Sequence, residues 1–291
     1  MTMQISASYR RHRRRQRLQL ALLLTPGVLL LATGLIWPFA KMFGMSFFDH
    51  YPNTTGYTLD HYLEFLGDPY FLGIAFDTLS LGVIVTVLTA VIGYPVAWYL
   101  SRSPSRWRHL VFLGVVSPLL VSIVVRTIGW TILLGNEGLI NNLLIMLGFI
   151  DQPLGLMRSF WSVVVGMTHI LLPFMVVAIT SVLGKIDESL LESAAVLGAP
   201  PWKRFYKIAL PLSVQGLASG SVIVFCLCVG AYITPIWLGR GHVNVMSIAI
   251  YEQMVVMVDW PLGSAASALL TIATLLILMG YGLAIRKHAQ R

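Results

Sequence analysis

Charged side chains are scarce in this sequence. Of its 291 residues, 11% are Asp, Glu, Lys or Arg and 57% are hydrophobic, whereas soluble proteins average about 25% charged and about 45–50% apolar residues. A chain of this composition cannot cover a water-facing surface with polar groups. The composition therefore excludes a soluble globular protein and indicates an integral membrane protein.

The motifs of common catalytic and metal sites are also missing. The sequence has no GxxxxGK[ST] phosphate-binding loop and no HExxH, and its isolated acids and histidines form no nucleophile–base pair. Its two cysteines, Cys226 and Cys228, lie inside an apolar run, where they are expected to pack rather than to supply a thiolate or a zinc ligand. We therefore expect a chain that is not an enzyme and holds no cofactor or metal, with a membrane hydrolase as a weak alternative.

The net charge of +8 would suit nucleic acid, but the positions of the charges do not. Six arginines precede the first apolar run, in the manner of a topology signal: Arg10, Arg11, Arg13, Arg14, Arg15 and Arg17. A twin-arginine export signal is the alternative, but the apolar run that follows is long and shows no small-residue cleavage site. The partner predicted from these charges is a lipid bilayer and not nucleic acid.

Six apolar stretches reach the length of about 20 residues that a membrane crossing needs. They are roughly Leu18–Phe39, Phe71–Leu100, Leu110–Leu134, Phe160–Leu183, Ser213–Leu238 and Ser264–Ile285. No repeat of about 20–50 residues and no low-complexity linker divides them. The sequence thus predicts an all-α integral membrane protein with six transmembrane helices in a single domain, residues 1–291.

The charges between these stretches predict the orientation. Sixteen of the 20 Lys and Arg residues lie before the first stretch, in 102–109, in 184–212 or after Ile285. The segments on the other side are acidic and contain Asp49, Asp60, Glu64, Asp68, Glu137, Asp151, Glu252 and Asp259. Because cytoplasmic loops carry the excess of Lys and Arg, we expect both termini and segment 184–212 in the cytoplasm.

Three local patterns predict details of the helices. Gly216 and Gly220 form a GxxxG pair in the fifth stretch, and such pairs let two helix backbones approach closely. Pro118, in the third stretch, can kink its helix. The apolar run 139–149 is too short to span a bilayer, so we expect an interfacial or re-entrant helix there.

Segment 184–212 is polar and lies between the fourth and fifth stretches. Asp187 can cap a short helix that Gly198 and the following prolines end, and Pro201 suits the first position of a second short helix. The first helix has an apolar face that must dock on something, formed by Leu190, Leu191, Ala194, Ala195 and Leu197. An amphipathic loop on the membrane surface is the alternative interpretation.

The spacing within this segment resembles the EAA motif of ABC importer permeases, in which EAA is followed by three residues, G, nine residues and I-x-LP. The matching residues are Glu192, Ser193, Ala194, Gly198, Ile208, Leu210 and Pro211, with Ser193 in place of the first alanine. From about residue 60 onward the chain also resembles the spermidine/putrescine (PotB-type) permease family, in GYPVAW at 93–98, RTIGW at 126–130, HILLPFMV at 169–176, GAYITP at 230–235 and DWPLGSA at 259–265.

The resemblance implies the six-helix fold of a type I ABC importer permease in the bacterial inner membrane. It also implies a second, PotC-like permease as heterodimer partner, two cytoplasmic ATPase subunits that bind ATP and magnesium, and an extracytoplasmic substrate-binding protein. In that family the EAA segment forms the coupling helices, which seat in a cleft of the ATPase. The seven motif residues are therefore expected to be the ATPase-coupling residues of this chain.

Polar and aromatic residues within or near the membrane stretches are candidates for lining a substrate pathway, because charge at membrane depth usually faces protein or water. These candidates are Asp77, Arg126, Trp130, His169, Tyr232, Glu252, Asp259 and Trp260. Structural alternatives remain. Arg126 can reach outward or pair with Glu137, His169 can be a hydrogen-bonded packing residue, and Asp77 can cap a helix. His169 stands where PotB-type permeases often carry another residue.

The substrate is predicted less closely than the fold. Acids and aromatics outside the membrane favour a polyamine cation, whereas Arg126 and His169 favour a solute with an anionic group, such as an opine, an aminoalkylphosphonate or 4-aminobutyrate. A stand-alone ion-coupled transporter is an alternative of another class. It would need no docking segment and would usually show an internal repeat.

Overall fold

A computed structural model describes Gln19 and residues 22–289. The six arginines before Leu18, and Leu18 itself, lie outside the described residues. Within the described part the chain is helical, with one isolated β-bridge between Phe48 and Tyr57 and no strand. The predicted all-α fold is confirmed.

Six helical stretches of the described chain are long and apolar enough to cross a membrane. They are Leu22–Met45, Pro69–Arg102 (α4), Ile123–Met146 (α6, Ile123–Leu134, and α7, Leu139–Met146), Phe160–Leu183 (α8), Pro201–Val229 (α10, Pro201–Arg204; η3, Phe205–Ala209; α11, Leu210–Val229) and Trp260–Ile285 within α14 (Trp260–Ala289). The predicted number of six is confirmed. The first crossing extends to Met45 rather than Phe39, the sixth begins at Trp260 rather than Ser264, and the third and fifth differ most from their predicted bounds.

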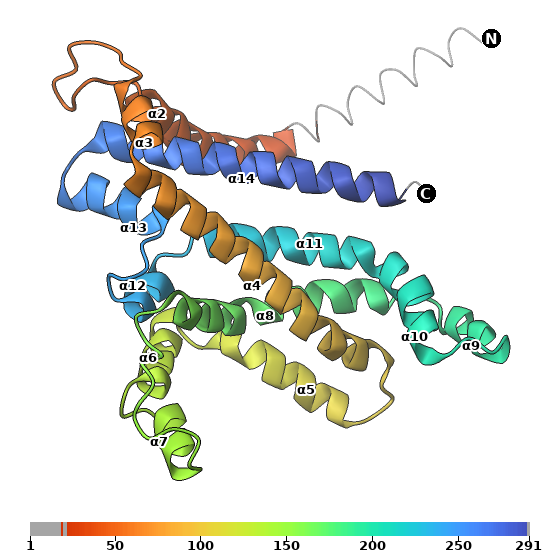
Figure 1. Cartoon of the computed structure of the whole chain (residues 1–291). Helices are drawn as coiled ribbons and strands as arrows, with labels where there is room; N and C mark the ends of the chain where they lie inside the picture. Colours follow the sequence, from red (N-terminus) through yellow and green to blue (C-terminus); the bar gives the residue numbers. More distant parts are fainter. Residues whose placement is uncertain (1–18, 20–21, 290–291) are drawn as a thin grey trace, which may run out of the picture.

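The core of the bundle is made by α4, α8 and α11, which run side by side (Figure 1). In the most apolar part of α8, 61% of the residues are buried. The predicted GxxxG contact joins α11 to α8. A Cβ added at Gly220 would lie 2.7 Å from the Met175 sulfur, and one at Gly216 would lie 2.9 Å from the Ala178 carbonyl oxygen. Only glycine allows this approach.

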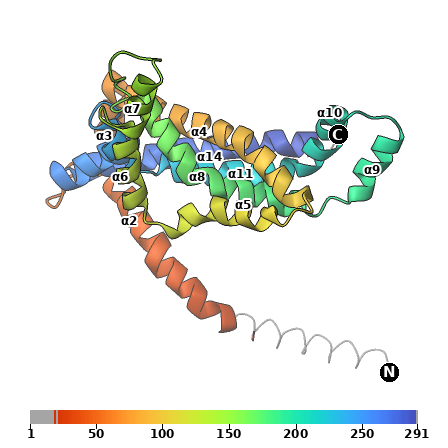
Figure 2. The ribbon, with the colours of Figure 1, turned by 90° about the horizontal axis from the view of Figure 1, so that it is seen from below.

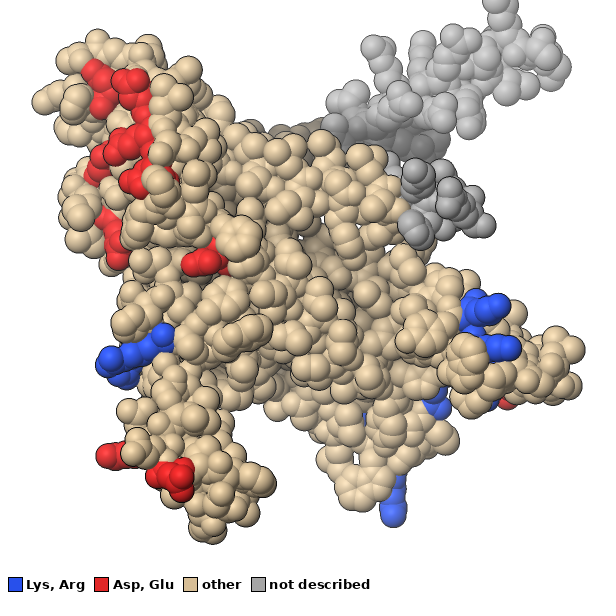
Figure 3. Space-filling view, viewed as in Figure 1, with Lys and Arg blue, Asp and Glu red and all other residues tan. Residues whose placement is uncertain are grey.

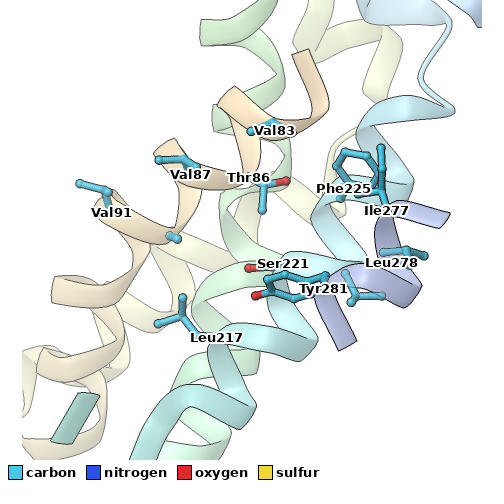
Figure 4. A pocket seen from close by; sticks show the side chains of 12 residues that line it. Val83, Thr86, Val87, Val91, Leu217, Ser221, Phe225, Ile277, Leu278 and Tyr281 are labelled. Carbon is cyan, nitrogen blue, oxygen red and sulfur yellow. The ribbon is translucent and has the colours of Figure 1, made fainter. Parts of the chain in front are cut away.

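The first and last helices lie at the periphery. In the most apolar part of 22–45 no residue is buried, and in that part of α14 only 6% of the residues are buried. Figure 2 shows the first helix leaving the bundle. An apolar cavity of about 340 Å³ lies between α14 and the core helices α4 and α11. Thr86 and Val87 of α4, Ser221 of α11 and Tyr281 of α14 surround it (Figure 4). Because it contains none of the predicted pathway residues, we do not assign the pathway there.

The third crossing is broken, so the predicted single helix over 110–134 is wrong. The chain forms α5 (Trp107–Val116) and a 3₁₀ turn, η2 (Ser117–Leu120), and becomes extended at Val121 before α6 begins. Pro118 has no N–H to donate to the Gly114 carbonyl, which accepts the Ser117 hydroxyl instead at 3.0 Å. α5 lies along the bundle, whereas α6 and α7 turn away from it (Figure 1). A short helix does form within 139–149, as α7. It continues the apolar stretch Ile123–Met146, so its interfacial or re-entrant position stays a prediction.

The fifth crossing is shifted toward the N-terminus relative to the predicted 213–238. Its helix starts at Pro201, ends at Val229, and is followed after a short loop by α12 (Ile233–Gly239). A continuous helix would bring the ring of Pro235 against the carbonyl of residue 231. The break four residues earlier avoids this clash.

Opposite charges gather at opposite ends of the bundle (Figure 3). Acidic side chains cover the end formed by α2 (Trp37–Met45), α3 (Asp60–Gly67) and α13 (Met246–Tyr251), where a small apolar cluster is centred on Phe65 and Met246. Basic side chains lie near α5 and α10 at the other end, and a basic spot lies beside α12. The separation agrees with the charge pattern used to predict orientation; the orientation itself stays a prediction.

Candidate functional site

The segment predicted to couple to an ATPase begins with a capped helix, α9 (Glu188–Val196), which projects from the end of the bundle (Figures 1 and 2). The Asp187 carboxylate accepts the Ser189 backbone N–H at 3.0 Å, which satisfies one of the free donors of the first turn. Glu188 adds negative charge at the positive end of the helix dipole. The predicted N-terminal cap is confirmed.

Gly198 ends α9 in the left-handed conformation, with a φ of +78°. Its N–H donates to the Ala195 carbonyl at 2.9 Å, and the Ala199 N–H donates to the Ala194 carbonyl at 2.9 Å. This pair of bonds is a Schellman motif, and its left-handed position favours glycine because other residues are strained there. The predicted stop is confirmed, and it explains why the motif has glycine at this position.

The second half of the segment is not the separate short helix that the sequence predicted. Pro201 does begin it, but α10 continues through the π-helical turn η3 into α11, so that 201–229 form one helical stretch. Pro211 has no N–H to donate to the Lys207 carbonyl, and η3 widens the helix just before this missing bond. The fifth membrane helix therefore starts within the coupling segment.

The motif residues differ in exposure. Glu192, Ser193, Gly198 and Pro211 are exposed, and Ala194, Ile208 and Leu210 are half-buried. Of the predicted apolar face only Leu191 is buried, whereas Leu197 is 87% exposed and its neighbour Val196 is 88% exposed. No part of the described chain covers these two side chains. The sequence-based prediction of a docking surface requires uncovered apolar side chains of this kind.

Three of the predicted pathway residues, Arg126 and Trp130 of α6 and His169 of α8, form a second site, here called the α6–α8 cluster. The Trp130 Nε1–H donates to His169 Nδ1 at 3.2 Å, and the two rings meet edge to face with centroids 5.5 Å apart. Arg126 Nε donates to the Val121 carbonyl at 3.1 Å, where the helix is broken. Its Nη1 is buried and has no hydrogen-bond partner in the described chain, so one guanidinium donor is unsatisfied.

Of the structural alternatives, the geometry fits His169 as a hydrogen-bonded packing residue but not Arg126 as the ion-pair partner of Glu137. No ion pair joins Arg126 to Glu137 in the described chain, where the only pair within 4.0 Å is His50 with Asp49. His169 is exposed on α8, a helix that is otherwise largely buried. It lies nine residues after Phe160, at about 14 Å from the start of the helix. A polar side chain exposed at that depth faces a partner or water rather than lipid.

Two other predicted residues, Tyr232 and Glu252, lie together with Tyr251. The rings of Tyr232 and Tyr251 are 4.9 Å apart between centroids. Partial burial, and then the nearby Tyr251 and Glu252, raise the pKa of Tyr232 above its usual value. Sequence reasoning missed Tyr251, although its position next to Glu252 could have indicated it. The arrangement combines one carboxylate with two aromatic faces, which suits a cation.

The remaining predicted pathway residues are separate. The Asp259 carboxylate accepts the Leu262 N–H at 3.0 Å and so caps α14, and Trp260 packs against Tyr51 with ring centroids 5.9 Å apart. These contacts favour structural roles. Asp77 is half-buried in α4, eight residues after the helix begins, so it does not cap that helix.

Comparison with known families identifies the chain. Residues 91–290 match the family described as the binding-protein-dependent transport system inner membrane component. The chain belongs to this family. It is therefore an inner-membrane, multi-pass permease subunit of an ABC importer, and not an enzyme. The resemblance seen in the motifs is confirmed, and the alternative of a stand-alone ion-coupled transporter is set aside.

Curated relatives cover most of this permease. The spermidine/putrescine transport system permease protein PotB of Escherichia coli K12 is 34% identical over 225 residues, which cover 77% of this chain and 82% of the relative. PotB of Haemophilus influenzae is 31% identical over 224 residues, covering 77% and 78%. The E. coli inner membrane ABC transporter permease protein YdcU is 30% identical over 202 residues, covering 65% and 64%.

Solved structures confirm the fold of the permease. A chain of a bacterial alginate ABC transporter, in complex with an alginate pentasaccharide-bound periplasmic protein, matches with a TM-score of 0.80 at 21% identity, covering 95% of this chain and 96% of that one. The MetNI methionine ABC transporter matches with a TM-score of 0.58 at 17% identity, covering 76% and 99%. The predicted type I importer fold is confirmed.

Proposed function

We propose that residues 1–291 act as one permease domain in which segment 184–212 couples a cytoplasmic ATPase to transport. The observation that carries this proposal is the projecting helix α9, with Val196 and Leu197 uncovered beside an exposed Glu192. These two apolar side chains stand uncovered on a projecting, otherwise polar segment, and an ATPase surface is the cover that we propose for them. Since α10 continues into α11, a displacement of the segment would pass directly to the fifth membrane helix.

The proposed assembly contains a second, PotC-like permease, two ATPase subunits that bind ATP and magnesium, and an extracytoplasmic binding protein. In this proposal both termini and α9 lie in the cytoplasm. The support is that α9, the described start of the first helix near Leu22 and the described end of α14 lie toward the same end of the bundle as the basic side chains near α5 and α10. The binding protein docks on the acidic end, at α2, α3 and α13. ATP binding closes the ATPases, which differ in their contacts with α9 between the open and closed states, and this difference shifts the permease between its two access states.

We propose a polyamine as the substrate. Two findings support it: the PotB relatives are named for spermidine and putrescine transport, and the chain gathers acids at the proposed outer end, including Glu252 beside Tyr232 and Tyr251. The second candidate is an opine, aminoalkylphosphonate, 4-aminobutyrate or similar zwitterion. The free guanidinium donor of Arg126 and the neighbouring His169 favour it.

The test of coupling is Glu192→Lys, with Glu188→Lys as control. Both glutamates lie on α9 and the charge change is the same, but only Glu192 belongs to the motif. We expect Glu192→Lys to abolish uptake and the ATPase activity stimulated by the binding protein, while membrane insertion is unchanged and the control stays active. Normal uptake by Glu192→Lys would contradict the proposal. Competition of putrescine with 4-aminobutyrate for uptake separates the two substrate classes.

A further inference from the structure

The last turns of α4 present three large side chains toward the coupling segment. Tyr94, Trp98 and Arg102 follow at intervals of four residues, so they share one face of the helix. Tyr94 and Trp98 lie in the GYPVAW string at 93–98, but no sequence motif joined them to Arg102. We call the three residues the α4 stripe. Its members contact both ends of segment 184–212, although α4 is separated from that segment by the third and fourth crossings.

Arg102 holds the entry to the segment. Its Nη2 donates to the Leu183 carbonyl at 3.2 Å and to the Ile186 carbonyl at 3.0 Å. The first carbonyl is at the end of α8 and also accepts the Ile186 N–H at 3.2 Å; carbonyls at a helix C-terminus attract positive charge. The second directly precedes Asp187, the cap of α9. One guanidinium therefore fixes the turn between the fourth membrane helix and the coupling helix.

Charge and packing support the same contact. The Arg102 guanidinium lies over the Trp98 ring, 5.9 Å from its centroid. Hydrogen bonds from the Ser189 backbone and hydroxyl, and then the positive charge of Arg102, hold the pKa of Asp187 below its usual value. The arginine thus lies close enough to the cap to favour its charged form.

Tyr94 and Trp98 hold the exit from the segment. The ring of Phe205, the first residue of η3, meets Tyr94 edge to face with centroids 5.2 Å apart and meets Trp98 at 6.2 Å. The Tyr94 hydroxyl is hydrogen-bonded to the Ser213 hydroxyl at 2.7 Å, and both side chains are buried. The widened turn that joins the coupling segment to α11 is therefore packed against α4.

We propose that the α4 stripe is a positioning element that makes α4 move together with the coupling segment. It rests on the proposed coupling role of 184–212. The chain links the segment to α8 and α11, and Ile186 packs against the core; the further link, to α4, is the stripe. With it, entry and exit are both tied to a third core helix, so displacement of α9 moves α4, α8 and α11 as one body rather than bending the connections.

The test uses the complete transporter in proteoliposomes with its binding protein, and measures solute taken up per ATP hydrolysed. Arg102→Gln removes the charge and both bonds, and Tyr94→Phe removes only the hydroxyl bond to Ser213. Two matched controls make the same changes outside the stripe: Arg108→Gln, at an exposed arginine of α5, and Tyr99→Phe, at an exposed tyrosine of α4.

We expect Arg102→Gln to lower uptake per ATP by about fivefold or more, the range of a typical coupling free energy, while the ATPase still copurifies and its basal rate is unchanged. Tyr94→Phe should act in the same direction, and Arg102→Lys should restore part of the ratio because it keeps the charge. These readouts separate positioning from misfolding, which would also remove copurification.

The inference is overturned if Arg102→Gln and Tyr94→Phe both take up as much solute per ATP hydrolysed as the controls. If Arg102→Gln does not reach the membrane, Arg102→Lys and Tyr94→Phe carry the test in the same way. The outcome is distinguishable from failure of the coupling role itself. If the coupling role fails, Glu192→Lys transports normally. If only the stripe proposal fails, Glu192→Lys is inactive and the stripe variants transport normally.

Discussion

The coupling segment and the α6–α8 cluster are built in opposite ways. α9 takes its shape from bonds between residues a few positions apart, such as Asp187 with Ser189 and Gly198 with Ala195. The cluster joins Trp130 to His169, 39 residues apart, and depends on how α6 packs against α8. A local motif can be read from sequence, whereas a cluster of distant residues exists only in the fold.

This difference also separates what the two regions can control. The coupling segment faces the proposed motor and shares no hydrogen bond or ring contact with the cluster among the described residues. A change there should therefore reduce the transport of every solute alike. The cluster offers specific donors, Arg126 Nη1 and the imidazole of His169. A change there should alter the ratio between solutes. The predictions below test this division.

The largest effect is expected for Gly198→Asp. The left-handed conformation costs a residue other than glycine about 1–2 kcal/mol, and the added side chain stands on the surface proposed to dock on the ATPase. We expect uptake of putrescine and of 4-aminobutyrate to fall to background together, measured with labelled solutes in whole cells.

The matched control is Gly241→Asp. Gly241 has a φ of +79° and, like Gly198, no neighbouring atom within 4 Å of an added Cβ, but it lies outside the motif. Aspartate at position 241 has the same backbone cost but does not lie on the surface proposed to dock on the ATPase. Equal loss of uptake in both variants would mean that backbone strain, and not docking, explains the effect.

The second effect is a change of selectivity in Arg126→Gln. Hydrogen bonds to charged groups contribute about 1.5–3 kcal/mol. Uptake of a solute that presents a carboxylate to Arg126 should therefore fall about tenfold or more relative to uptake of putrescine. Lys41→Gln, on the peripheral first helix, is the control for charge removal. If Arg126→Gln lowers the uptake of both solutes equally, the cluster does not control selectivity and the proposed difference between the two regions is wrong.

Sequence reasoning was most successful where short-range chemistry decides the structure. Asp187 as cap, Gly198 as stop and Pro201 as helix start follow from their own backbone properties and could be predicted. The break at Pro118 was predicted only as a kink, because the 3₁₀ turn and extended Val121 depend on packing around α5. The continuity of α10 with α11 was missed, since a proline at Pro211 is more often read as a boundary than as part of a widened turn.

The candidate site divides along the same line. The seven EAA-motif residues could be placed by spacing alone, whereas eight pathway candidates could be named but not grouped. Burial and hydrogen bonds then separate them: Trp130 meets His169, with Arg126 one turn earlier on α6, while Asp259 caps a helix. The α4 stripe was not predicted at all, because nothing in the sequence near Arg102 indicates that its partners are carbonyls of Leu183 and Ile186.

The smallest effect is expected for Asp187→Ala, which removes the cap of α9. Loss of an N-cap costs about 1 kcal/mol, so protection of the α9 amides in hydrogen exchange should fall about fivefold while uptake persists.

Because the pKa of Asp187 is lowered in the fold, the cap contributes fully above the ordinary aspartate pKa and is lost only as pH falls through the lower folded value. The wild-type α9 should therefore show constant cap protection at neutral pH, and Asp187→Asn should retain most of it since asparagine also caps helices. A loss in Asp187→Asn as large as in Asp187→Ala would show that the charge beside Arg102, rather than the cap hydrogen bond, holds the coupling helix.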